Sequence, residues 1–205
     1  MIRGYHLIFG AYGFWLPNDP RGSWSDFVGK WELVKFGRST KSIERRELTE
    51  AEERERQEAK QSLMYPPVQF TGLQARAVGQ GFAESVEKGR YALWACAILP
   101  EHVHLVVARS RFAVEKIATF LKGSATKQLR KQNLDPLAAF AKPGDKPPSP
   151  WAERRWKVFL DSEHAIENAI AYVNDNPVKE GKPPQKWNFV TPFTGIDKAG
   201  WVTYG

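Results

Sequence analysis

The amino-acid sequence predicts an α+β protein with a ferredoxin-like fold, a split β-α-β arrangement in which an antiparallel sheet carries helices packed on one face. Once a charged segment at about residues 37–70 is set aside, the expected elements follow the order β-α-β-β-α-β. Only Pro100 and Glu101 separate two of the expected strands, and so short a link makes them an antiparallel hairpin. The chain has 205 residues, of which 42% are hydrophobic, which is enough for one domain with a core.

We therefore expect a single domain over residues 1–205, with the charged insertion at about 37–70 and a Pro-rich tail at about 177–205. The first strand is expected over residues 5–12, which are aromatic and apolar. In the insertion, Thr49 and Glu52 form a capping box that predicts a helix over residues 50–63. The acidic and basic residues interleaved along it are typical of a solvated surface helix.

A second helix is expected over residues 72–88, where Gly79 and Gly81 weaken its middle and Gly89 ends it. The two hairpin strands follow, over residues 91–99 and 102–109. An amphipathic helix over residues 112–132 turns one apolar side inward, formed by Ile117, Leu121, Ala125 and Leu129.

The fourth strand is expected over residues 156–160 (WKVFL), after a loop rich in proline and lysine. Asp161 or Ser162 then caps a last helix. We expect this helix to end at about Asp175, because a proline disfavours helical conformation in the residue before it and Asn176-Pro177 follows.

The composition favours a polyanionic partner, because the formal net charge is +7. No apolar stretch approaches the roughly 20 residues that a membrane-spanning helix needs. Cys96 is the only cysteine and lies in an apolar run, so we interpret it as a core residue and expect no disulfide. Together these features predict a cytoplasmic protein without a membrane segment.

His102 and His104 are candidates for metal ligands. They are two residues apart in an expected strand, so both side chains project from one face together with Val106. Two imidazoles placed in this way can reach one metal ion. The same pattern also fits two polar residues on an exposed strand.

Tyr172 and Asn176 are the second candidate pair. They are four residues apart in the last expected helix, so the phenol and the amide lie on the same helix face. Tyr172 lies off the apolar stripe that Ile166, Ile170 and Val173 form. An ordinary tyrosine at a helix edge would show the same pattern.

Taken together, these residues resemble the single-tyrosine HUH transposases, and most closely the REP-associated tyrosine transposases and their insertion-sequence relatives. The resemblance extends over most of the chain except residues 37–70. The segments that carry it are GFWLPNDPRGSW (13–24), LPEHVHLVV (99–107), LKGSATKQL (121–129), WKVFLDS (156–162) and AYVNDNPVKEG (171–181).

The resemblance implies a fold of the HUH endonuclease type and a divalent metal ion, Mg²⁺ or Mn²⁺, bound by His102 and His104 with help from Asn176. It implies that Tyr172 attacks a phosphodiester of single-stranded DNA, in hairpin-containing substrates, and forms a 5′-phosphotyrosine that a free 3′-hydroxyl can reverse. A phenol has a pKa near 10, so it needs such help at neutral pH. Two positions depart from the family pattern: Glu101 replaces the usual Asn, and Lys182 replaces the usual apolar residue.

Candidate DNA contacts lie in the basic part of the chain. Residues 104–160 hold twelve Lys or Arg against four Asp or Glu. The predicted phosphate contacts are Lys116, Lys127, Arg130, Lys131, Arg154 and Arg155. Trp151 and Trp156 next to these arginines fit either a surface on which single-stranded bases stack or the core.

His6 and His164 are interpreted as structural residues. Three other functions remain open: a domesticated protein that binds DNA hairpins without cutting them, a metal hydrolase that uses a carboxylate such as Glu101, and a replication or plasmid-transfer initiator. The sequence leaves open the DNA target, the choice between monomer and homodimer, and the role of residues 37–70.

Overall fold

The fold is described by a computed structural model for residues 1–16, 18–19, 31–36 and 48–196. Most of the second half of the motif at 13–24, the start of the charged insertion and the end of the tail lie outside the described residues.

The centre of the molecule is a sheet of four strands in the order β2-β3-β1-β4, in which every neighbouring pair is antiparallel. Its strands are β1 (Gly4–Ala11), β2 (Leu93–Ile98), β3 (His102–Ala108) and β4 (Trp151–Leu160). This order and these directions confirm the predicted ferredoxin-like arrangement. β4 is longer than expected, because it already begins at Trp151, which pairs with Ala11 at the end of β1.

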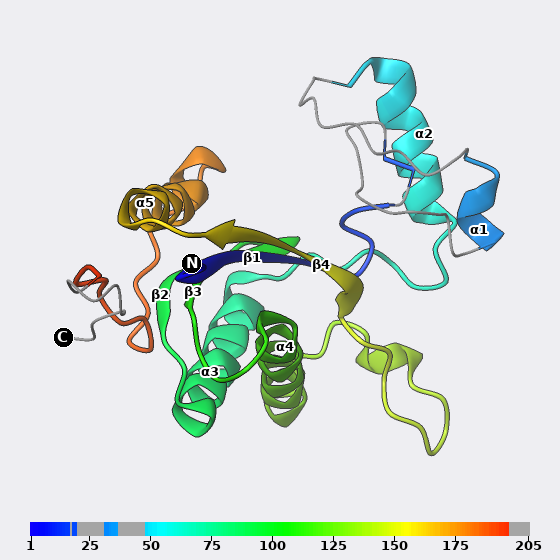
Figure 1. Cartoon of the computed structure of the whole chain (residues 1–205). Coiled ribbons are helices and arrows are strands. Elements are labelled where there is room, and N and C mark those ends of the chain that lie inside the picture. The colour runs from blue at the N-terminus through cyan, green and yellow to red at the C-terminus, as the bar shows by residue number, and fades with distance from the viewer. Residues whose placement is uncertain (17, 20–30, 37–47, 197–205) are drawn as a thin grey trace.

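Two helices, α3 (Gly72–Gly89) and α4 (Val114–Lys131), cover one face of the sheet (Figure 1). They pack closely at Gly81, where an added Cβ would lie 2.6 Å from Cα of Ala125. The glycine that was expected to weaken α3 thus permits its contact with α4. Arg90, rather than Gly89, ends α3 in the left-handed conformation.

The last helix, α5 (Glu163–Lys179), lies on the opposite face of the sheet (Figure 1). Ile166 and Val173 are fully buried against the sheet there. The prediction that α5 ends at about Asp175 is wrong, because Pro177 lies inside the helix. The turn is closed beyond the proline ring, where the Glu180 amide donates to the Asn176 carbonyl oxygen at 3.2 Å.

Two helices lie beyond one end of the sheet (Figure 1): α1 (Trp31–Val34), which precedes the charged insertion, and α2 (Glu50–Gln61), which lies within it. The predicted capping box of Thr49 and Glu52 is present at the start of α2. A short 3-10 helix, η1 (Ala138–Phe140), lies in the loop before β4. None of the helices in the described ranges is long and apolar enough to cross a membrane.

Candidate active site

The side chains of His102 and His104 lie on the sheet face that α5 covers in part. Val106, which shares this face of β3, belongs to the hydrophobic cluster beneath α5. The two imidazole centroids are 4.8 Å apart. His104 is 6% exposed, so α5 and the neighbouring strand shield most of it from water.

A third histidine, His6, completes the cluster from β1. Its Nε2 lies 3.0 Å from Nδ1 of His104, which is a hydrogen bond whose direction depends on the tautomers. Burial lowers the pKa of His6 to about 4, so this ring is neutral at pH 7 and its Nε2 can accept a hydrogen bond from Nδ1 of His104. The sequence interpretation of His6 as a structural residue missed this contact. It depends on the pairing of β1 with β3, which places His6 opposite Val106.

Tyr172 of α5 stands over this cluster. Its ring centroid is 5.6 Å from that of His6 and 5.7 Å from that of His104, with edge-on geometry in both pairs. Nζ of Lys179 lies 5.3 Å from the phenol ring centroid, two turns further along the same helix. The structure therefore brings together the predicted tyrosine, the two predicted histidines and a cation.

Asn176 and Glu180 continue the same face of α5 towards His102. Asn176 is 8% exposed, and its buried amide nitrogen has no hydrogen-bond partner among the described residues. Oε1 of Glu180 lies 3.5 Å from Nε2 of His102. Sequence reasoning missed Glu180, although its spacing of eight residues from Tyr172 marks the same helix face. The expected end of the helix before Pro177 concealed this relation.

The His102 imidazole is in the neutral form that can bind a metal ion through a ring nitrogen. Burial lowers the pKa of His102 to about 4, against an opposing effect of Glu101, so the imidazole is neutral at pH 7. Burial also raises the pKa of Glu180 above its usual value. The His102 ring is held by Phe14, which stacks on it with centroids 4.6 Å apart and planes inclined by 16°.

The residues around His102 and His104 fit a divalent ion. Within the described ranges, no three His, Cys, Asp or Glu side chains form a group that could hold a metal ion by themselves. An additional ligand can come from Asn176, because rotation of its unpartnered amide exchanges nitrogen and oxygen. His6 then holds Nδ1 of His104, as an outer-shell partner of a metal-binding histidine does. The ligand set would be two imidazole nitrogens, an amide oxygen and, after release from His102, the Glu180 carboxylate.

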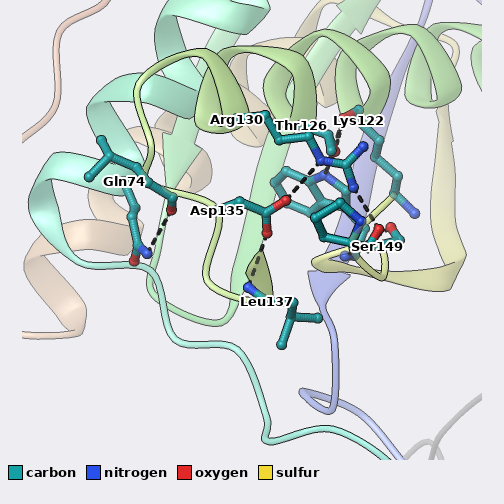
Figure 2. A network of polar contacts seen from close by, with 10 residues as sticks. Gln74, Lys122, Thr126, Arg130, Asp135, Leu137 and Ser149 are labelled. Atoms are coloured by element: carbon teal, nitrogen blue, oxygen red, sulfur yellow. Dashed lines mark hydrogen bonds and ion pairs between the residues drawn. The ribbon is translucent and has the colours of Figure 1, made fainter. Parts of the chain in front are cut away.

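The predicted DNA contacts on α4 lie on the other side of the sheet. Lys116, Lys127 and Lys131 are exposed there, and the structure does not bring them near Tyr172. Arg130 is engaged in a structural network: its Nε donates to the Asp135 carboxylate at 2.8 Å (Figure 2). Its Nη2 donates to the Pro147 carbonyl oxygen at 2.7 Å. This network fastens the loop before β4 to α4.

The predicted DNA-contacting residues and the tryptophans of β4 lie in different surroundings. Arg154 and Arg155 line a cavity of about 400 Å³ beside the start of α4, together with Leu7, Val114, Glu115, Glu153 and Lys157. Trp151 is 4% exposed and belongs to the core beneath α3 and α4. Trp156 is 40% exposed and pairs with Ile8, which in turn pairs with His104, so it lies on the face of the histidines. His164 is exposed and its ring contacts Asn168 one helical turn on.

No protein-family model and no curated protein matches the chain. Among solved structures, one similar chain is a REP-associated tyrosine transposase bound to a REP hairpin, with 19% identity and a TM-score of 0.43 over 62% of this chain and 70% of that one. Another is a proposed transposase from Deinococcus radiodurans, with 12% identity and a TM-score of 0.41 over 85% of this chain and 91% of that one. Similarity at this level concerns the course of the chain alone, so what the site does depends on its own residues.

Proposed function

We propose that this protein is a metal-dependent transposase-type nuclease that cleaves and rejoins single-stranded DNA through Tyr172. The observation that carries the proposal is the position of the phenol, with its ring 5.6 and 5.7 Å from two histidine rings and on the same helix face as Asn176 and Glu180. A nucleophile next to a set of nitrogen and oxygen ligands is the arrangement that phosphoryl transfer through a covalent intermediate requires.

In the proposed reaction, the Tyr172 oxygen bonds to phosphorus and the bond from phosphorus to the 3′-oxygen breaks. The phenol gives up its proton to water, the departing 3′-oxygen takes one from water to become a 3′-hydroxyl, and the 5′-phosphate stays on the tyrosine, so no net proton is gained or lost. A later 3′-hydroxyl reverses these steps, so joining needs no ATP. A divalent ion, Mg²⁺ or Mn²⁺, held by His102, His104 and Asn176, would neutralise phosphate oxygens.

Other residues of the site would orient the reactants. His6 holds the ring of His104 through the 3.0 Å contact between Nε2 and Nδ1. Lys179 supplies a positive charge beside the phenol, where a DNA phosphate must come. His6 and His104 are in contact without substrate, so this part of the site needs little reorganisation when the phosphate binds.

The form of the site face supports a single-stranded substrate. The hydrophobic cluster beneath α5 includes Leu160 at the end of β4, but Trp156 and Val158 of that strand are exposed. A base that follows the scissile phosphate across β1 can therefore stack on Trp156, as bases do on aromatic side chains in proteins that bind single strands. The family resemblance adds hairpin-containing DNA as the expected target.

A covalent-adduct assay tests the proposal. Single-stranded oligonucleotides from the flanks of the gene, with and without hairpins, are labelled at the 3′ end, mixed with protein and Mn²⁺ or Mg²⁺, and run on a denaturing gel. We expect a labelled band at protein size that requires the metal and disappears in Tyr172→Phe. The control Tyr5→Phe removes a phenol from the opposite sheet face, where Tyr5 packs with the core, and should keep the band.

Two outcomes would overturn the proposed chemistry. Free cleavage products that persist in Tyr172→Phe would indicate a metal hydrolase without a covalent intermediate. Binding of hairpin DNA without an adduct, over many oligonucleotides and both metals, would indicate a protein that binds DNA and does not cut it.

A further inference from the structure

The charged insertion touches the candidate active site at Glu101, the residue immediately before His102. Nζ of Lys60, from α2, lies 3.2 Å from Oε1 of Glu101. The side-chain amide of Gln69 donates to the same oxygen at 3.3 Å. Both partners of the ion pair are largely shielded, with side-chain exposures of 16% for Lys60 and 25% for Glu101. The carboxylate is therefore held from two positions of the insertion.

Backbone hydrogen bonds fasten the same turn on two sides. The amide of Ala11, at the end of β1, donates to the Glu101 carbonyl at 2.7 Å. The amide of Phe70, at the end of the insertion, donates to the Pro100 carbonyl at 2.7 Å. β3 begins at the next residue, His102. The position of this turn therefore sets the position of the His102 backbone, from which the imidazole projects.

The ring of His102 is fixed by the segment that leads into the insertion. Phe14 stacks on the imidazole with an interplanar angle of 16°. On its other side, Nε2 faces the Glu180 carboxylate. Lys60 and Gln69 thus hold the side chain of the residue before His102, and Phe14 holds the plane of the His102 ring.

We infer that two residues between β1 and α3 are positioning residues of the active site: Lys60 holds Glu101, and Phe14 holds the ring of His102. The inference rests on the proposed function and gives the insertion a role in it. Lys60 also compensates the Glu101 charge, which lies close enough to Glu180 to act on it electrostatically. Loss of that cation leaves a shielded carboxylate without its charge partner, and a shift of the turn that carries His102 would give the carboxylate more contact with water.

The test compares three variants of α2. Lys60→Met breaks the ion pair while it keeps the aliphatic stem, Lys60→Arg keeps the charge, and Arg54→Met removes an exposed cation of the same helix as a matched control. The affinity of each protein for Mn²⁺ alone is measured by titration calorimetry without DNA. We expect Lys60→Met to bind about 10-fold more weakly, the lower end of the effect of losing a direct outer-shell partner, because Lys60 acts on His102 only through Glu101. Lys60→Arg and Arg54→Met should stay close to the wild type.

A second readout does not depend on the metal. In metal-free protein with labelled histidines, NMR spectra of the ring nitrogens should show the His102 signals shifted or broadened in Lys60→Met, and the exposed His164 signals unchanged. Phe14→Leu should move the His102 signals as well, which keeps the test informative if Lys60→Met does not fold. Folding of each variant is checked by thermal unfolding.

The outcomes separate this inference from the proposed function. If the wild type binds no Mn²⁺ and forms no adduct, the proposed function fails, and the His102 signals alone decide the positioning role. If the wild type forms the adduct while Lys60→Met retains full Mn²⁺ affinity and unchanged His102 signals, the positioning inference is wrong. An equal loss in Arg54→Met would also overturn it, because the effect would then belong to α2 as a whole.

Discussion

A shielded cation in α4 leads to a prediction about the pH dependence of stability. Nζ of Lys122 donates to the Ala152 carbonyl at 2.7 Å and lies 5.1 Å from the centroid of the Phe9 ring. Burial, with a smaller contribution from Arg155, lowers its pKa from 10.5 to about 8. Between pH 8 and 10.5 the unfolded chain therefore binds a proton that the folded chain has lost, so the free energy of unfolding rises with pH in this window.

The expected size follows from this pKa difference, which corresponds to about 3 kcal/mol, reduced to about 2 kcal/mol by partial access to water. Relative to Lys122→Met, the wild type should gain this amount of stability between pH 7 and pH 10.5, whatever the two proteins' difference at pH 7. Urea unfolding at several pH values measures the change. Lys127→Met, which removes an exposed lysine of the same helix, serves as the control and should run parallel to the wild type.

Parallel pH profiles for the wild type and Lys122→Met would refute this reasoning. They would mean that the hydrogen bond to Ala152 and the contact with the Phe9 ring stabilise the ammonium in the folded protein to the same extent as water stabilises it in the unfolded chain. A change of opposite sign would mean that the folded state holds the proton more tightly than the unfolded chain.

Two further predictions concern DNA binding and packing. In a Tyr172→Phe background, Trp156→Ala should weaken the binding of a single-stranded oligonucleotide at least about 5-fold, measured by fluorescence anisotropy, whereas Phe159→Ala, on the opposite face of the same strand, should not; equal effects would contradict the assignment of faces. Gly81→Ala should lower the free energy of unfolding by about 1–3 kcal/mol, because the new Cβ would lie 2.6 Å from Cα of Ala125. Gly123→Ala in α4 has nothing within 4 Å of the new Cβ and should raise it by about 0.5–1 kcal/mol; thermal unfolding that ranks these two variants in the reverse order would contradict the packing argument.

Local patterns in the sequence were sufficient for most of the elements. The alternation of side chains in residues 102–108 placed His102 and His104 on one face, since a strand repeats every two residues. The capping box of Thr49 and Glu52 placed the start of α2, because its hydrogen bonds join residues three apart in the chain. The short link at Pro100 and Glu101 predicted the hairpin for the same reason of local geometry.

Relations between distant segments were decided only by the tertiary structure. Strand register brought His6 next to His104. No local pattern reveals which strands pair or which of their residues lie opposite one another. The position of α5 across the sheet placed the α4 lysines on the face away from Tyr172, although charge alone had favoured them as DNA contacts. Helix packing also carried α5 past Pro177, against the local preference of the residue before a proline.

The sequence by itself determined the order of the elements, the histidine pair and the tyrosine with its neighbouring amide, because each is written in spacings of a few residues. The tertiary structure decided which of these side chains meet, which face they share, and that Glu180 contacts His102 while the insertion's Lys60 contacts Glu101. The physical reason is that secondary structure depends on local hydrogen bonds and side-chain periodicity, whereas a site depends on the burial of surfaces from segments far apart in the chain.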